Sequence, residues 1–283
     1  MADIIKALQE GTDAAGGYLV PEQYVKKLQK LVYAKSVAIP EMTEIKMTSD
    51  TTKIPKMAGG GTAYWVSETG TITESNQSFG IITLTAKKVA ALATISTELL
   101  EDNAVNVAQV VVDDFSKAIA LEIDKQEIQG DGTVFTGIAD TSATTNLVDA
   151  GANALSLDHI NSAIKLILED NHDYPDRIFL HPSRFIDLIN MTDSNNRPLF
   201  EEVLKEGEIG KIKGMNVRVS TQVPSSKVVI GKSKDFGYHG MRRTLKMQKQ
   251  YQISTDTWVY QVNTRVGFAI KYPDSFAIIH NLA

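Results

Sequence analysis

Two short glycine-containing runs could bind the phosphates of a nucleotide. Gly231-Lys232-Ser233 matches the end of a phosphate-binding loop, in which backbone amides and a lysine hold phosphate oxygens. The complete motif needs a glycine five residues before Gly231, and that position holds Ser226. Gly59-Gly60-Gly61 lacks the spacing and the strand-to-helix context of a dinucleotide-binding loop, so a turn is the better interpretation. Neither run predicts a nucleotide site.

Histidines, serines and acidic residues could hold a metal ion or form a catalytic centre. None of the five histidines are spaced to place two ligands on one helical face, and the chain has no cysteine. No Gly-x-Ser-x-Gly elbow is present, and Ser183 beside His181 carries no triad signature. Residues 193–197 fail the calcium-loop pattern because Arg197 occupies a ligand position. The sequence therefore predicts no catalytic residue, no metal-binding residue and no cofactor.

The composition is typical of a globular protein that folds without cross-links. Of its 283 residues, 43% are hydrophobic and 22% are charged, so the chain can bury a real core. The absence of cysteine favours an intracellular protein. The N-terminus lacks the features of a signal peptide, and no stretch approaches the roughly 18 apolar residues of a membrane span. The net charge of −5 argues against a protein built to grip a phosphate backbone.

Two segments that alternate apolar and polar residues predict the strands of a long hairpin. Ile45 and Met47 alternate with polar neighbours, and Ile82, Leu84 and Ala86 do the same further along. Between them lie a glycine-rich turn and a tip rich in threonine, serine and glutamate. An isolated two-stranded ribbon is marginally stable in water, and this one has few large apolar residues. We therefore expect the hairpin to lie on another subunit.

The strongest helical pattern covers residues 106–129. Asn106 is the predicted N-cap, and Gly130 follows where a C-terminal glycine is common. A helix of this length is a rod on the order of 36 Å long. Beyond Gly137, helical and strand patterns alternate, and an extended sheet is expected after Met241. One apolar stripe comprises Ala108, Val111, Val112, Phe115, Ala118, Ile119 and Ile123.

A series of short runs links these elements to a known family. They are Gly59 to Glu68, Thr71 to Ser75, Phe79, Leu84 to Leu92, Ile95 to Asp102, Gly130 to Thr133, and Thr136 to Ile138. In this order the series resembles the major capsid proteins of tailed bacteriophages of the HK97 type. The resemblance implies an α+β, HK97-like capsid fold with an axial domain, a peripheral domain with a long spine helix, an extended β-hairpin called the E-loop, and an N-terminal arm.

The resemblance also implies domain boundaries. The N-terminal arm and a short helix would occupy 1–38, the E-loop hairpin 39–91, the peripheral domain 92–132 plus 240–270 with its spine helix at 106–129, and the axial domain 133–239 plus 271–283. Many relatives carry an N-terminal scaffolding segment that a protease removes. Sixteen residues precede Gly17, which fits a segment already removed, a separate scaffold or none, and Met1 favours a naturally short arm.

The function implied by the resemblance is structural rather than enzymatic. Copies would assemble into the pentamers and hexamers of an icosahedral virion head, built in the host cytoplasm around double-stranded DNA without sequence-specific contacts. Separate scaffold, portal and decoration proteins are candidate partners, and no membrane or cofactor is implied. For Tyr64 and Ile72, local stabilisation of the hairpin is an open alternative to a role between subunits. The candidate intersubunit contacts are Tyr64, Trp65, Val66, Ile72 and Phe79.

Covalent cross-linking between subunits is not expected. Some relatives join a lysine to an asparagine through an isopeptide bond that a glutamate catalyses. The matching tip, Ser67-Glu68-Thr69-Gly70, has no lysine, and Asp256 and Asn263 stand where the asparagine and glutamate would be needed. Alternative functions are an encapsulin-like compartment or gene-transfer particle of the same fold, and, less favoured, a soluble enzyme.

Overall fold

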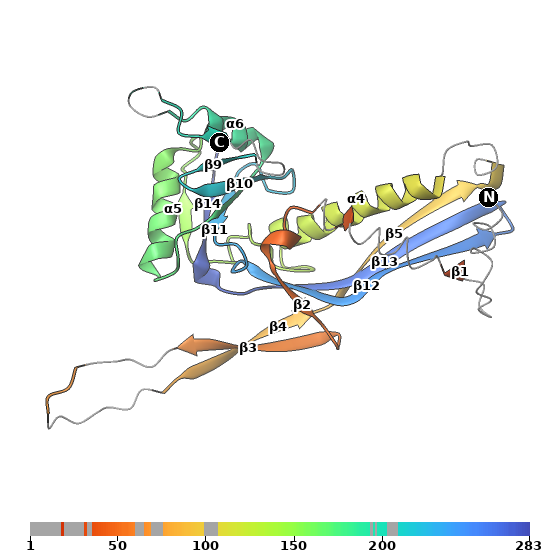
Figure 1. Ribbon diagram of the computed structural model, residues 1–283, viewed down its shortest axis with the longest axis horizontal. Helices are drawn as coiled ribbons and strands as arrows, with labels where there is room; N and C mark the ends of the chain where they lie inside the picture. The colour runs from red at the N-terminus through yellow and green to blue at the C-terminus, as the bar shows by residue number, and fades with distance from the viewer. Residues whose placement is uncertain are drawn as a thin grey trace.

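The molecule consists of two sheet-based lobes and a hairpin that projects from the region between them (Figure 1). The computed structural model describes residues 18–19, 31–32, 36–59, 65–68, 76–98, 107–192, 195, 197–202 and 209–283. Helices and strands are mixed along the chain, so the predicted α+β class is confirmed. No helix within these ranges is long and apolar enough to cross a membrane.

The first lobe contains a mixed sheet of seven strands, here called the wide sheet, in the order β6-β14-β11-β7-β10-β9-β8. Strand β10 pairs parallel with β7, whereas β11 pairs antiparallel with both β7 and β14. The strands are β6 (Leu147–Asp149), β7 (Arg177–Leu180), β8 (Glu201–Glu202), β9 (Gly210–Ile212), β10 (Met215–Val219), β11 (Val228–Gly231) and β14 (Phe276–His280).

Both faces of the wide sheet are buried. Helices α5 (Leu157–Glu169) and α6 (Pro182–Ile189) contribute to the core on one face, where Ile178 of β7 lies. Its neighbour Phe179 belongs to a second core together with Phe236 and Ile128 on the other face. Because successive residues of a strand point to opposite faces, a strand covered on both sides reads as a continuous apolar run, as β11 does.

The second lobe contains a sheet of five strands, here called the long sheet. Its order is β1-β12-β13-β5, and β2 pairs parallel with β12. Strands β12 and β13 form a long antiparallel pair whose register shifts between Met241 and Lys246, which indicates a bulge. The strands are β1 (Tyr18–Leu19), β2 (Thr43–Lys46), β5 (Lys87–Ser96), β12 (Gly237–Gln252) and β13 (Thr257–Ile270).

Helix α4 (Val107–Gln129) lies along one face of the long sheet, and its last turns reach the wide sheet (Figure 1). Its bounds match the predicted helix to within one residue, although Asn106 lies outside the described residues. Most of the predicted apolar stripe is buried, and Phe115 and Ile119 pack against strand residues such as Val262, whereas Ala118 is exposed. The helix therefore bridges the two lobes as one rigid element.

Gly130 serves a different purpose from the one its position suggested. Its φ angle is not positive, so it is not a left-handed helix cap. Instead, a Cβ atom at Gly130 would lie 2.3 Å from the carbonyl oxygen of Gln126 and 2.4 Å from that of Phe135. Glycine is needed there because the following loop packs directly on the helix end.

The hairpin comprises β3 (Thr51–Gly59) and β4 (Ser78–Thr85), which pair antiparallel with each other. The flanking residues 43–46 and 87–91, which the sequence placed in the hairpin, pair with strands of the long sheet. Two short 3-10 turns, η1 (Ile39–Glu41) and η2 (Pro273–Ser275), lie where the chain passes between the lobes. Nearly all of the predicted N-terminal arm and short helix, 1–38, lies outside the described residues.

Candidate functional site

The outer face of the projecting hairpin carries exposed apolar side chains. Met57 lies opposite Phe79 in the register of the two strands, and Pro55 lies opposite Ile81. The exposed fractions are 59% for Met57, 70% for Phe79 and 63% for Ile81. Burying one side chain of this size is worth about 1.5–3 kcal/mol, and contiguous apolar surface usually marks a contact. We call Pro55, Met57, Phe79 and Ile81 the hairpin patch.

The opposite face of the hairpin anchors its base to the body of the protein. Ile82 and Leu84 of β4 are buried in a small core with Met47, against which Tyr238 of β12 packs. The alternation predicted for Ile82, Leu84 and Ala86 is therefore present. Beyond this base the hairpin extends away from both lobes (Figure 1). Within the described residues the hairpin is thus held at its base, and its outer face is exposed.

Residues 65–68 lie at the far end of the hairpin (Figure 1), and Trp65 among them is fully exposed. Val66 beside it is also exposed, as are Ser67 and Glu68. Among the predicted contact residues, Trp65, Val66 and Phe79 are therefore all exposed, and Val66 is the least exposed of the three. Tyr64 and Ile72 lie outside the described residues.

The sequence reasoning missed three residues of the hairpin patch, Pro55, Met57 and Ile81. The signal was present, because Ile81 is adjacent to the inward-pointing Ile82 and must therefore point outward. Met57 becomes a neighbour of Phe79 only through the strand register. Register depends on the turn and on the buried face, so it was not available from the local pattern.

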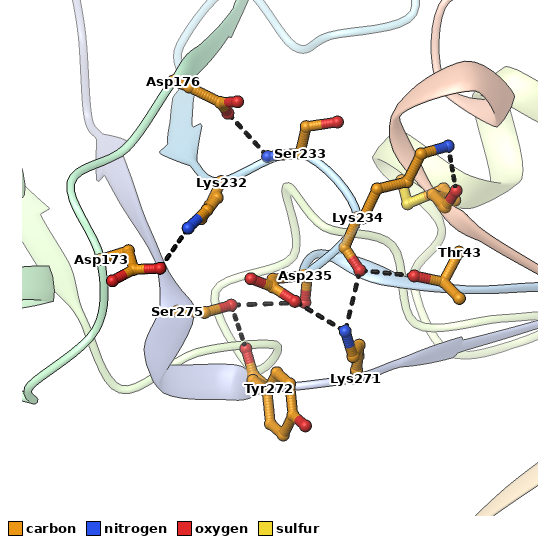
Figure 2. A network of polar contacts seen from close by, with 11 residues as sticks. Thr43, Asp173, Asp176, Lys232, Ser233, Lys234, Asp235, Lys271, Tyr272 and Ser275 are labelled. Atoms are coloured by element: carbon orange, nitrogen blue, oxygen red, sulfur yellow. Dashed lines mark hydrogen bonds and ion pairs between the residues drawn. The ribbon is translucent and has the colours of Figure 1, made fainter.

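A network of polar contacts clamps the base of the hairpin to the loop that joins the two sheets, as Figure 2 shows in part. The Lys234 ammonium donates to the carbonyl oxygens of Pro40 (2.6 Å) and Met42 (2.8 Å). The Thr43 hydroxyl donates to the carbonyl oxygen of Lys234 over 2.6 Å. Asp235 of the same loop pairs at 2.6 Å with Lys271, which directly follows β13. These contacts fix where the hairpin leaves the body.

Buried charges continue this clamp into the wide sheet. The Glu41 carboxylate pairs with Arg177 of β7 and Arg218 of β10, each at 2.8 Å. Burial alone would raise the pKa of Glu41, but a hydrogen bond from Ser233 and the charges of the two arginines hold it below its usual range. Glu41 therefore remains ionised and ties η1 to both strands.

Helix α4 holds the segment before η1 through a second buried group. The Asp124 carboxylate accepts hydrogen bonds from the Ser36 hydroxyl (2.6 Å) and from the backbone amides of Val37 (2.8 Å) and Ala38 (3.1 Å). One turn later, Glu127 pairs with His239 of β12 at 2.5 Å. The helix, the long sheet and the approach to the hairpin are thus joined by buried and part-buried polar contacts.

The described residues contain no group of three or more His, Asp or Glu side chains that could hold a metal ion. His181 and Ser183 are in contact at 2.8 Å, but the His181 ring also accepts from the Ser183 backbone amide and caps α6. Asp173 and Lys232, next to the phosphate-loop-like run, form an ion pair with each other. The most distinctive feature of the described residues is therefore the hairpin patch, an exposed apolar surface suited to protein contacts on an element with a rigid base.

The family assignment rests on almost the whole chain. The model of the phage capsid family matches residues 16–281. The chain belongs to this family. The described part of this phage capsid protein accordingly combines the α4 rod, the long sheet and the projecting hairpin in one molecule.

A curated relative of this phage capsid protein is the major capsid protein of Klebsiella oxytoca phage phiKO2. The two are 24% identical over 222 residues, which is 75% of this chain and 51% of the relative. The chain therefore spans about half the length of the curated relative it matches.

Solved structures share the fold of this phage capsid protein. A chain from Microbacterium phage Oxtober96 matches with a TM-score of 0.72 and 19% identity over 88% of this chain and 91% of that one. A chain from Mycobacterium phage Adephagia matches with a TM-score of 0.70 and 15% identity, over 100% of this chain and 97% of that one. A capsid chain of a native GTA particle matches with a TM-score of 0.70 and 16% identity, over 98% of this chain and 96% of that one. The expected HK97-like fold is therefore confirmed.

Proposed function

We propose that this chain is a major capsid protein that self-assembles into the pentamers and hexamers of an icosahedral phage head around double-stranded DNA. The observation that carries the proposal is the hairpin patch, because Met57, Phe79 and Ile81 are exposed on an element that the described residues of its own chain do not cover. Family membership points the same way. The role is structural, located in the virion after assembly in the host cytoplasm, and involves neither catalysis nor a cofactor.

Within this proposal, the parts of the molecule have distinct roles. The hairpin serves as the E-loop and lies on a neighbouring copy, with Tyr64, Trp65, Val66, Ile72 and Phe79 among its contacts. Helix α4 is the spine of a peripheral domain that includes the long sheet, and the wide sheet forms the axial domain. The clamp around Glu41 and Lys234 sets the angle at which the hairpin meets its neighbour. Closed symmetric shells depend on such fixed angles.

Non-covalent contacts hold the proposed shell together. Glu68 stands at the hairpin tip without a lysine beside it. Asn263 is 5% exposed and accepts a hydrogen bond from Arg243, while Asp256 accepts from Tyr251 and Thr97. Side chains engaged in this way within their own subunit are poorly placed to form an isopeptide bond. The net charge of −5 suits a wall that encloses DNA without adhering to it, with separate scaffold, portal and decoration proteins as partners.

Expression of the chain followed by negative-stain imaging and gel filtration tests the proposal. We expect closed particles, and denaturing gels of those particles should show a single band near 31 kDa. A monomer of that size at every concentration and salt condition would overturn the shell role.

A second candidate is a shell of the same fold with other contents, which the likeness to the GTA capsid supports. This class includes gene-transfer particles and encapsulin-like compartments. Analysis of the particle contents separates the two candidates. Phage-genome DNA that resists nuclease supports the phage head, whereas a co-purified enzyme cargo without DNA supports the encapsulin-like compartment.

A further inference from the structure

A cleft between α4 and β5 has the properties of a binding site for an amphipathic side chain. Its apolar lining includes Ile123 on the helix, Phe135 in the following loop and Val266 on β13. Polar residues line the same cleft, namely the exposed Lys87, Lys88 and Glu122 and the half-buried Gln126. The cleft therefore combines an apolar floor with charges and amide groups around it.

The polar residues of the cleft define what could bind there. The Gln126 amide nitrogen donates to the Glu122 carboxylate over 3.2 Å, so the Gln126 amide oxygen can accept a hydrogen bond from an incoming donor. No ion pair involving Lys87 or Lys88 is formed within the described ranges. A fitting ligand would present a flat apolar group, one N–H donor and a nearby negative charge.

The tip of the hairpin presents this combination within four residues. Trp65 is fully exposed, and its indole has a large apolar surface with a single N–H donor. Glu68, also exposed, supplies a negative charge three residues later. Exposing a tryptophan completely is unfavourable in water, so its position at the end of a projecting element needs a partner surface.

The tip cannot reach the cleft of its own chain. Figure 1 shows that the hairpin and α4 extend in opposite directions from the region between the lobes, and the segment with Trp65 lies at the far end of the hairpin. The cleft lies near the C-terminal end of α4, where Gln126 and Val134 are found. Occupation of the cleft by Trp65 is therefore possible only between two copies.

We propose that Trp65 of one copy inserts into the cleft between α4 and β5 of a neighbouring copy. The indole ring packs on Ile123, Phe135 and Val266, and its N–H donates to the Gln126 amide oxygen. Glu68 pairs with Lys87 and Lys88 at the mouth of the cleft. This inference rests on the proposed shell function and adds to it the surface that receives the hairpin tip.

Disulfide trapping tests this contact cleanly because the chain has no native cysteine. Ser67→Cys places a thiol at the tip, and Ala90→Cys places one in the cleft, while Trp65 and Glu68 stay intact. Mild oxidation of assembled particles should convert most of the double variant into a ladder of covalent multimers on non-reducing gels, and a reductant should reverse it. The matched control pairs Ser67→Cys with Ala118→Cys, an exposed alanine of α4 outside the cleft, and should stay monomeric on the gel.

Imaging of the same samples keeps the two proposals separate. Particles that form normally but give no ladder, or an equal ladder with the control pair, would overturn the cleft contact and leave the shell role standing. Failure of the unmodified chain to form any particle would overturn the shell role, and the cleft contact with it.

Fluorescence provides a second measurement that needs no cysteine. The chain has two tryptophans, so Trp258→Phe leaves Trp65 as the only one. On assembly its emission should move to shorter wavelength, and quenching by acrylamide should fall. Val134→Lys, which places a charge in the cleft lining, should abolish both changes. An emission spectrum that is the same in subunits and particles would contradict the insertion of Trp65.

Discussion

Glu41 accepts a hydrogen bond from the Nε atom of Arg177 over 2.8 Å, and this contact fixes η1, which precedes β2 and the hairpin, to the wide sheet. The two residues are far apart in sequence, and Arg218 pairs with the other oxygen of the same carboxylate. Because each carboxylate oxygen has its own arginine partner, the Glu41 side chain is held from two sides. The Glu41 side chain is therefore one of the contacts that hold the chain leading to the hairpin, beside those of Lys234 and Thr43.

Replacing Glu41 should destabilise the subunit strongly. Glu41→Ala leaves Arg177 and Arg218 without their partner in a buried site, so the free energy of unfolding should fall by about 3–5 kcal/mol. Urea unfolding of the unassembled subunit measures this loss. The control is Glu169→Gln, which breaks an exposed pair with Lys165 and should change stability by less than about 1 kcal/mol. Equal effects of both substitutions would contradict the clamp.

The stability of the subunit should depend on the protonation of His239. Burial by itself would lower the pKa of His239, but the charge and hydrogen bond of Glu127, together with the charges of Glu44 and Asp124, raise it above the ordinary value. A raised folded-state pKa means that the stabilisation is complete below about pH 6.5 and is lost as the pH rises through the folded-state value. Each unit of difference between the folded-state and unfolded-state pKa corresponds to about 1.4 kcal/mol in the free energy of unfolding.

The variant His239→Gln isolates this contribution, because glutamine can still donate to Glu127 but does not titrate. Urea unfolding should show that the free energy of unfolding of the wild type exceeds that of the variant at pH 6, and that this difference is smaller at pH 9. If the difference between the two proteins is the same at both pH values, folding does not raise the pKa of His239.

Gly137 should tolerate no side chain. A Cβ atom there would lie 2.5 Å from the carbonyl oxygen of Ile128, which is backbone and cannot move aside cheaply. Gly137→Ala should therefore cost about 1–3 kcal/mol or more in thermal or urea unfolding. Gly214 has a positive φ of 79° but open space around its Cβ position, so Gly214→Asn should cost less, because asparagine tolerates that conformation. A reversed order would contradict the close packing at the end of α4.

The hairpin patch should matter for assembly and not for folding. Phe79→Ser changes an exposed residue, so the unassembled subunit should keep its stability to within about 0.5 kcal/mol while particle yield falls sharply. Ile82→Ser, on the buried face of the same strand, should instead destabilise the subunit by about 2 kcal/mol or more. Gel filtration and imaging measure assembly, and urea unfolding measures stability. Normal particle yield with Phe79→Ser would show that the patch makes no contact.

The sequence by itself determined the elements whose signals are local. The α4 helix follows from a continuous apolar stripe, and the buried face of the hairpin follows from the alternation at Ile82 and Leu84, because both periods are properties of the backbone. The run of family motifs and the absence of catalytic spacing are also readable without a structure. The projecting hairpin was predicted because it has too few large apolar residues to form a core.

Only the tertiary structure decided which distant residues meet. Glu127 and His239 are 112 positions apart and form one buried pair, and no local pattern marks either partner. The same holds for the clamp at Glu41, the neighbours of Gly130 and the cleft at Ile123, Phe135 and Val266. Such contacts depend on how the two sheets and α4 pack together, and packing is a property of the whole chain, whereas periodicity is set by the neighbours of each residue.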